Sequence, residues 1–221
     1  MTGTTTTRAI AALAVLAAVL AAGIPAQADS VPGSGEASYG RVGKRALVVG
    51  DSLAVGTRPY LVRSLRGWRV GHSVSISKHA PQGAGELARR GARGLPPVVV
   101  ASLGTNDDPG AVSSFDHSVR VALRAVGKRG CVVWPNIVRP SVGGRTYAGY
   151  NGVLRRLEAK RRNLIVFNWA RMAGRNRGWF GGDGVHPNAT GYAARGRAIA
   201  NAVRECRGRL VKDGDRREEL K

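Results

Sequence analysis

Residues 97–103 read Pro-Val-Val-Val-Ala-Ser-Leu, and this β-branched, apolar run decides the fold class. A strand without polar alternation is typical of a parallel sheet that is buried on both faces. Four further short segments have strand-like patterns, at residues 46–49, 74–77, 131–134 and 163–167. The sequence therefore predicts five strands, with residues 97–103 as the clearest of them.

Amphipathic segments with helical spacing separate these strands. We expect helices within residues 53–65, 85–94, 113–126, 147–157 and 189–204. Regular alternation of strands and helices favours a parallel, doubly wound sheet with helices on both faces. The predicted fold class is α/β, a three-layer α/β/α sandwich built on a five-stranded sheet.

The amino terminus has the pattern of a secretory leader. Arg8 precedes an apolar stretch at residues 9–24, and Ala26-Gln27-Ala28 matches the small-x-small pattern of a cleavage site. A membrane anchor is the alternative, but the apolar stretch is shorter than the ~20 residues of a membrane-spanning helix. We expect residues 1–28 to be a signal peptide cleaved after Ala28, and the protein to be secreted.

The remaining chain has the length of one domain. Residues 29–43 are rich in Gly, Ser and Pro, and we expect a flexible lead-in there. The domain is predicted at residues 44–207. Residues 208–221 form a charged tail that we expect to fray.

The chain is strongly basic, with 35 Lys and Arg against 14 Asp and Glu and a net charge of +21. Such an excess attracts polyanions such as anionic lipids or cell-wall polymers. The basic residues are spread over many segments, and no zinc-finger, RRM or basic-zipper pattern is present. We therefore expect a solvated basic surface, no specific nucleic-acid partner, and a monomer.

Two cysteines, Cys131 and Cys206, predict one disulfide in an exported chain. Cys131 opens a predicted strand, and Cys206 lies near the end of the last predicted helix. Since the helices run antiparallel to the strands, both positions belong at the amino-terminal edge of the sheet. Two unpaired thiols are the alternative.

Polar residues follow the strands at the opposite edge of the sheet. Ser52 comes just after the strand at 46–49, and Asn106 follows the strand at 97–103. Asp183 and His186 share a short loop before the last helix. Open α/β sheets carry their reactive groups at the carboxyl ends of the strands. A serine at a helix start is also a common cap, so the combination of segments carries more weight than Ser52 alone.

These residue types suit nucleophilic acyl chemistry. A serine hydroxyl becomes an effective nucleophile when a neutral histidine takes its proton, and a carboxylate stabilises the resulting imidazolium. The three-residue separation of Asp183 and His186 keeps that pair together on one loop.

Three segments resemble the first, third and fifth conserved blocks of the GDSL/SGNH hydrolase family. They are Gly50-Asp51-Ser52-Leu53, Gly104-Thr105-Asn106-Asp107 and Asp183-Gly184-Val185-His186-Pro187. The resemblance implies a flavodoxin-like fold and ester hydrolysis. It also implies that Ser52 is the nucleophile, His186 the base and Asp183 its orienting partner.

The resemblance assigns the oxyanion to the Asn106 amide and the Ser52 N–H, while the family's second block is altered here. The expected glycine falls at His79 or Ala80, or at Gly83 if the loop is shorter. His79 is also a candidate substrate contact. Arg139, which follows the fourth strand, and Trp179 are the other two candidates, each with solvent exposure or core packing as its alternative.

The sequence thus predicts a secreted serine esterase that hydrolyses short acyl esters without a metal or cofactor. An acyltransferase that moves the acyl group to a sugar or cell-wall hydroxyl from the same site is the alternative. A non-catalytic polyanion-binding protein is the third hypothesis, and the intact Ser52, Asn106, Asp183 and His186 oppose it.

Overall fold

The computed structural model describes residues 42–220. The expected signal peptide at residues 1–28, and the expected lead-in up to residue 41, lie outside the described residues. Within residues 42–220, no helix combines the length and the apolar character that crossing a membrane requires.

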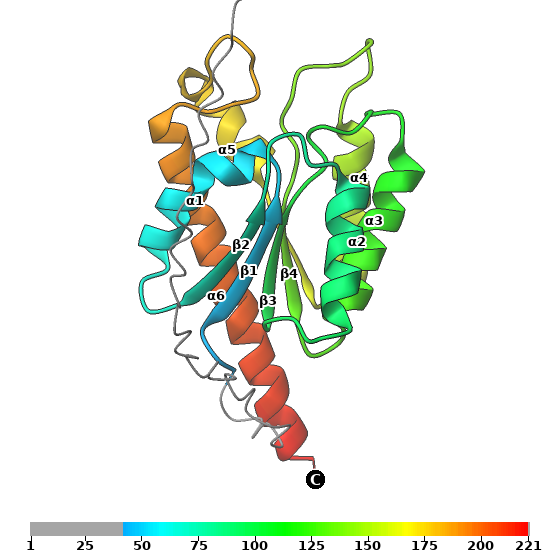
Figure 1. Cartoon of the computed structure of the whole chain (residues 1–221), viewed down its shortest axis with the longest axis vertical. Coiled ribbons are helices and arrows are strands. Elements are labelled where there is room, and N and C mark those ends of the chain that lie inside the picture. The colour runs from blue at the N-terminus through cyan, green and yellow to red at the C-terminus, as the bar shows by residue number, and fades with distance from the viewer. Residues whose placement is uncertain (1–41, 221) are drawn as a thin grey trace, which may run out of the picture. The chain divides into compact units, whose positions relative to one another are not determined.

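A five-stranded parallel sheet forms the centre of the fold (Figure 1). Its strands are β1 (Arg45–Gly50), β2 (Arg69–Val74), β3 (Val98–Ser102), β4 (Cys131–Pro135) and β5 (Leu164–Phe167). The strand order is β2-β1-β3-β4-β5, and every neighbouring pair is parallel. This is the doubly wound order of flavodoxin-like sheets, so the predicted fold class is confirmed.

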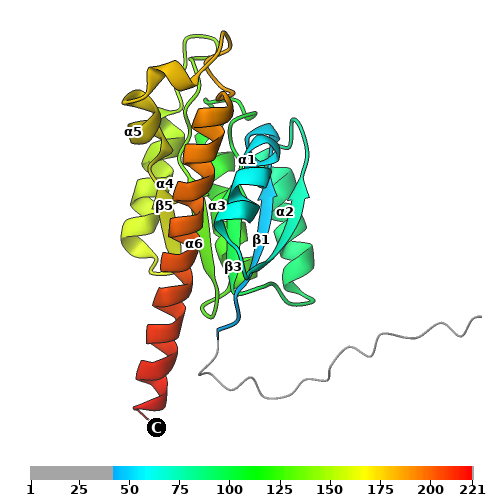
Figure 2. The same ribbon diagram turned by 90° about the vertical axis from the view of Figure 1, so that its left-hand side faces the viewer.

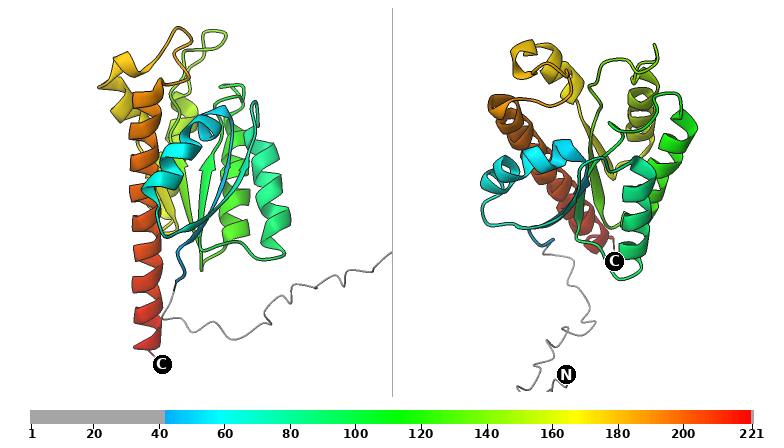
Figure 3. Two further views of the ribbon diagram at one scale, coloured as in Figure 1. Left: turned by 60° about the vertical axis from the view of Figure 1, so that its left-hand side comes forward. Right: turned by 45° about the horizontal axis from the view of Figure 1, so that its top comes forward.

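Helices cover both faces of the sheet (Figure 3). They are α1 (Ser52–Ser64), α2 (Ala80–Gly91), α3 (Val112–Val126), α4 (Ala148–Lys160), α5 (Trp169–Gly174) and α6 (Ala189–Glu218). One apolar core joins the sheet to α2, α3 and α4, and a second joins it to α1 and α6. The strands β3 and β4 are buried along their whole length, and for β3 the apolar sequence at 97–103 predicts this.

The prediction of a strand at residues 74–77 is wrong. The second strand is Arg69–Val74, and it lies at the edge of the sheet where β1 is its partner. Its pairing ends where β1 ends, with Gly50 beside Val74. The alternation of apolar residues continues to Ile76, but that side chain is 75% exposed because no neighbouring strand remains to pair with.

The second helix also begins earlier than predicted, at Ala80 and not at Gly85. Pro81 lies in the first turn, where its missing N–H costs nothing. The Gln82 side chain accepts the N–H of His79 at 2.9 Å, which stabilises the start of the helix. The glycines at 83 and 85 are accommodated inside the helix.

The last helix is much longer than the predicted 189–204. Helix α6 continues to Glu218, through most of the expected frayed tail, and passes beyond the amino ends of the strands (Figure 2). Leu210 packs against the second core, and Arg209 pairs with Glu205 one turn earlier at 2.7 Å. These contacts keep residues 208–218 helical, so the expectation of a frayed tail is wrong there.

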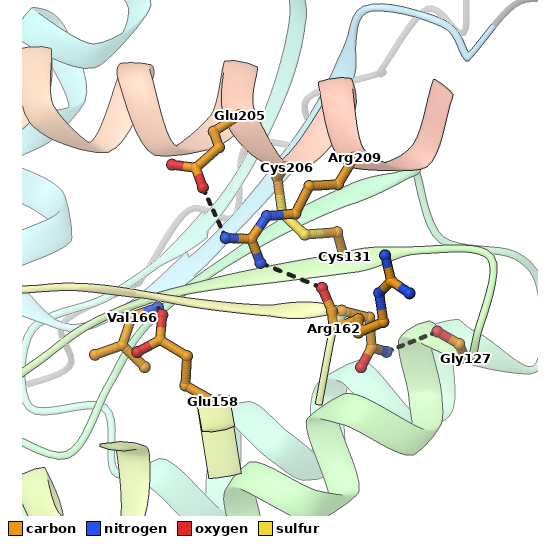
Figure 4. The surroundings of a disulfide bond; sticks show 9 residues. Gly127, Cys131, Glu158, Arg162, Val166, Glu205, Cys206 and Arg209 are labelled. Atoms are coloured by element: carbon orange, nitrogen blue, oxygen red, sulfur yellow. Dashed lines mark hydrogen bonds and ion pairs between the residues drawn. A yellow bond between two sulfur atoms is a disulfide. The ribbon is translucent and has the colours of Figure 1, made fainter. Parts of the chain in front are cut away.

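A disulfide joins Cys131 to Cys206, as predicted, with a Cα–Cα distance of 5.7 Å. It links the first residue of β4 to α6 at the amino-terminal edge of the sheet. Arg209 lies beside it and donates to the Arg162 carbonyl as well as to Glu205 (Figure 4). The bridge fixes α6 against the sheet at the edge opposite to Ser52.

Replacing both cysteines with serine should lower the free energy of unfolding by about 2–5 kcal/mol, because the bridge closes a loop of 75 residues. Urea denaturation of the double variant and of the oxidised wild type measures this difference. Equal midpoints and slopes would show that the bridge contributes nothing to stability.

Candidate active site

The candidate site lies at the carboxyl ends of β1 and β3, where the strand order reverses. Gly50 ends β1 in a crowded position, since a Cβ there would lie 2.5 Å from the Ala54 Cβ and 2.9 Å from the Ser102 carbonyl oxygen. The next residue, Asp51, donates its N–H to that carbonyl at 3.1 Å. Its carboxylate accepts the Leu53 N–H at 3.0 Å and caps α1. Ser52 therefore opens α1 at the switch point of the sheet.

The structure brings Ser52, His186 and Asp183 together. The Ser52 Oγ lies 2.8 Å from the His186 Nε2, over a sequence separation of 134 residues. The His186 Nδ1 lies 2.6 Å from the Asp183 Oδ2. This is a continuous hydroxyl–imidazole–carboxylate chain, and its three side chains are accessible to solvent.

Hydrogen bonds within the loop hold Asp183 in place. Its other oxygen, Oδ1, accepts the backbone N–H groups of Val185 at 2.9 Å and His186 at 3.0 Å. Gly184 has a φ of +62°, which favours glycine in this turn. The hydrogen bond from the His186 ring, together with the two backbone donors, holds the pKa of Asp183 well below its usual range. The carboxylate therefore stays ionised into acid solution.

Asn106 lies on the loop after β3, beside the loop that follows β2. Its Nδ2 donates to the Lys78 carbonyl at 3.3 Å, and the side chain is half-buried. One N–H of the amide thus fixes its orientation, which leaves the second N–H as a donor.

Asp107 joins the same two loops. Its carboxylate accepts the Ala80 N–H at 3.0 and 3.2 Å, at the start of α2. It also lies 3.4 Å from the Nδ1 of His79, whose side chain is 47% exposed. The Ala80 N–H and the His79 N–H are therefore both engaged, the latter by Gln82.

The assignment of Gly83 to the oxyanion hole is contradicted by the structure. Its N–H donates to the His79 carbonyl at 3.1 Å inside α2. Gly83 is buried, and a Cβ there would lie 2.3 Å from the Leu103 Cδ1. Close packing of α2 against the segment after β3 explains this glycine.

Of the candidates Arg139 and Trp179, only Arg139 reaches a cleft of about 530 Å³ that extends to Gly184. Arg139 lines the cleft and donates to the Thr105 carbonyl. Trp179 is not among the lining residues and stacks on the buried Trp169, with ring centroids 5.9 Å apart. Its carbonyl accepts the N–H of Asn188 at 2.7 Å, so Trp179 supports the loop that carries His186.

A buried arginine beneath the site was not identified from the sequence. The Nη1 of Arg195 donates to the Thr57 Oγ1 at 2.9 Å, and its Nη2 donates to the Ser102 Oγ at 3.0 Å. The guanidinium also lies 5.8 Å from the centroid of the Trp169 ring. Arg195 therefore ties α6, which follows the His186 loop, to α1 and to the end of β3.

Arg195 and the buried Asp51 are electrostatically coupled. Burial raises the pKa of Asp51, while the charge of Arg195 and the Leu53 N–H oppose that rise. Burial lowers the pKa of Arg195 to about 10, so this guanidinium stays charged at neutral pH. One signal was available in the sequence: Arg195 precedes Ile199 by four residues and Cys206 by eleven, on the buried stripe of α6.

Across residues 42–220, no three His, Cys, Asp or Glu side chains gather in a way that would hold a metal ion.

A comparison with protein-family models matches residues 33–194 to the GDSL-like lipase/acylhydrolase family. A comparison with curated proteins gives no match. Solved structures share the fold. The C-terminal catalytic domain of the peptidoglycan O-acetyltransferase OatA from Streptococcus pneumoniae has a TM-score of 0.65 and 18% identity, over 76% of this chain and 97% of that one.

Two other similar structures are a lipase/acylhydrolase and an acetylxylan esterase. The lipase/acylhydrolase from Enterococcus faecalis has a TM-score of 0.59 and 21% identity, over 75% of this chain and 96% of that one. The acetylxylan esterase Axe2 from Geobacillus stearothermophilus has a TM-score of 0.58 and 16% identity, over 73% and 95%. At sequence identities this low, the structural similarity shows only that these proteins and this chain share a fold.

Replacing Arg195 with methionine should lower the free energy of unfolding by about 3–5 kcal/mol, because it removes two buried hydrogen bonds and the positive charge that offsets the burial of Asp51. Arg197→Met, at an exposed position of the same helix, is the control and should change stability by less than about 0.5 kcal/mol. Asp51→Asn combined with Arg195→Met should recover part of the loss. Denaturant unfolding checks all three, and a wild-type midpoint for Arg195→Met would contradict the coupling.

Proposed function

The chain belongs to the GDSL-like lipase/acylhydrolase family, and from this we propose that it is a serine esterase whose nucleophile is Ser52. The observation that carries the proposal is the chain of contacts from Ser52 to His186 at 2.8 Å and from His186 to Asp183 at 2.6 Å. These distances are within the range for proton transfer from a hydroxyl to a base.

In the proposed reaction, the Ser52 Oγ attacks the acyl carbon and its proton passes to the His186 Nε2. Asp183 accepts a hydrogen bond from the Nδ1–H, which keeps Nε2 free as the acceptor and stabilises the imidazolium. The tetrahedral intermediate then expels the alcohol, which takes the proton from Nε2. Water attacks the acyl-serine in the second half, again deprotonated by His186, and releases the carboxylic acid and free Ser52.

We assign the oxyanion to the backbone N–H of Ser52 and to the Asn106 amide N–H that Lys78 does not use. A preorganised donor of this kind contributes about 3–4 kcal/mol to transition-state stabilisation. The three candidates for the glycine of the family's second block supply no further oxyanion donor. The backbone N–H groups of His79, Ala80 and Gly83 each donate to another acceptor already.

We propose that the cleft beside Gly184 receives part of the ester. Its lining is mainly apolar, with Arg139 and Arg177 as its charged members. A short acyl or small apolar group suits this lining, and an anionic group on the substrate suits the two arginines. Activity on nitrophenyl esters of increasing chain length tests the preference, with a maximum at short acyl chains expected.

We also propose that the protein is secreted after cleavage behind Ala28. The leader pattern supports this, and the Cys131–Cys206 disulfide is consistent with an oxidising compartment. N-terminal sequencing of the exported protein should begin at Asp29.

Acyl transfer is a second candidate function. The side chains of Asp183 and His186 are 52% and 45% exposed, so the site is open to a large hydroxyl-bearing acceptor as well as to water. A structure similar to this chain is that of a peptidoglycan O-acetyltransferase. Product analysis with added sugar acceptors distinguishes the two: esterified acceptor indicates transfer, and free acid alone indicates hydrolysis.

Replacing Ser52 with alanine should reduce hydrolysis of a short-chain nitrophenyl ester to below about one hundredth of the wild-type rate, because no acyl-serine can form. Ser75→Ala, at an exposed loop position, is the matched control and should retain activity. Unfolding curves establish that both variants are folded. A Ser52→Ala variant with near-normal activity would exclude the proposed nucleophile.

Activity should rise with pH through one ionisation, because His186 must be neutral to accept the Ser52 proton. The pKa of Asp183 is held low, so this carboxylate should add no further step in the mildly acidic range. His186→Ala should lose the rise, and Asp183→Asn should lower the rate by as much as about 10⁴-fold, because it favours the wrong imidazole tautomer. A His186→Ala variant with an unchanged pH profile would reject the mechanism.

A further inference from the structure

A wide groove lies away from the candidate active site, at the amino ends of β1 and β2. Its volume is about 1060 Å³, and it is lined by the start of these two strands, by α2 and by the turn after α2. Arg45, at the start of β1, is seven residues from Ser52 along an extended strand, which corresponds to roughly 20 Å. A ligand in this groove would therefore leave Ser52 free.

Arginines dominate the charge of this groove. Arg45 and Arg69 come from β1 and β2, and Arg89 and Arg93 come from α2 and the turn that follows it. All four are exposed. None of these four side chains makes a hydrogen bond or ion pair with another of the residues 42–220 that the structure describes.

The single acidic residue of the lining does not neutralise them. Glu86 already binds the Lys78 Nζ at 3.0 Å and the Arg90 Nε at 2.8 Å. Burial acts to raise the pKa of Glu86, but hydrogen bonds from Ser73, Lys78 and Arg90 hold it below its usual value. Glu86 is therefore fully paired with Lys78 and Arg90, and these three side chains together carry a net positive charge.

Arg45 and Arg69 place two like charges beside one another, and a bound anion would relieve their repulsion. They are partners in register on neighbouring strands. Gly71 follows Arg69 on the same face of β2, and the absence of a side chain there leaves the groove open between Arg69 and Ser73. The dipole of α2 accounts for Arg89 near its carboxyl end, but it does not account for the strand pair.

The remaining residues of the groove lining limit the type of anion that the groove can bind. The groove lining contains no aromatic residue on which bases could stack, as single-stranded nucleic-acid sites require. It also contains none of the exposed large apolar residues that would enter a bilayer. The planar guanidinium of arginine can bind two phosphate oxygens at once, and four arginines in one groove suit a ligand with repeated charges.

We propose that this groove binds a linear phosphodiester polymer that lacks bases, and that it holds the enzyme on such a polymer while Ser52 acts elsewhere. The four arginines would each contact phosphate oxygens of successive units. The contacts are electrostatic, so affinity should fall steeply with salt.

The test uses a fluorescent abasic deoxyribose-phosphate oligomer, with a thymidine oligomer of equal length and anionic phospholipid vesicles as the comparison probes. The abasic oligomer should bind the wild-type protein at least as tightly as the thymidine oligomer does. Arg45→Gln/Arg69→Gln should weaken this binding at least tenfold. It should also lower the slope of log affinity against log salt by about 1.4–1.8, since two phosphate contacts are lost.

Arg63→Gln/Arg66→Gln is the matched control, since it removes two exposed arginines at the end of α1 that do not line the groove. It should change the affinity by less than twofold. Arg89→Gln/Arg93→Gln is a second groove variant, and it provides the same test if Arg45→Gln/Arg69→Gln fails to fold. Hydrolysis of a nitrophenyl ester should stay at the wild-type rate in every folded variant.

Four outcomes would overturn the proposal. Equal losses in the groove and control variants would show diffuse attraction by net charge. Tighter binding of the thymidine oligomer would show that bases are recognised. Groove-dependent binding to vesicles without binding to the oligomer would indicate a membrane surface, and no binding of any probe would exclude the site.

Discussion

The close approach of β1 and β3 at their carboxyl ends is the constraint on which the site depends. A Cβ at Gly50 would lie 2.9 Å from the Ser102 carbonyl oxygen, so glycine alone allows the Asp51 N–H to reach that oxygen. This contact joins the start of α1 to the end of β3 and brings Ser52 to the switch point of the sheet. The same end of β3 leads into the loop of Asn106.

Two side chains with long-range contacts, Arg195 and Asp107, hold the other loops of the site near the carboxyl ends of β1 and β3. Arg195 reaches from α6 to Thr57 and Ser102, and so fixes the helix after the His186 loop relative to the helix that carries Ser52. Asp107 holds the start of α2 beside the loop after β3. Burying the charged groups of Arg195 and Asp51 costs free energy. That cost fits a role for Arg195 in holding α6 and α1 in one arrangement.

Much of the fold and of the candidate site could be predicted because the signals are local. The apolar strand at 97–103 and the pairing of Asp183 with His186 are examples. The errors have non-local causes. β2 ends where its partner β1 ends, and α2 begins at Ala80, whose N–H binds Asp107, 27 residues away. The packing of Gly83 against Leu103 could not be inferred from either segment alone.

The central claim is that Ser52 is a nucleophile activated by His186, and covalent labelling tests it most directly. The protein is treated with phenylmethylsulfonyl fluoride, and intact-mass and peptide-mass spectra are followed with time for the wild type and His186→Ala. The account predicts one adduct, on the peptide that contains Ser52, and a labelling rate at least about a hundredfold lower in His186→Ala. An adduct at another residue, or an equal rate in both proteins, would contradict it.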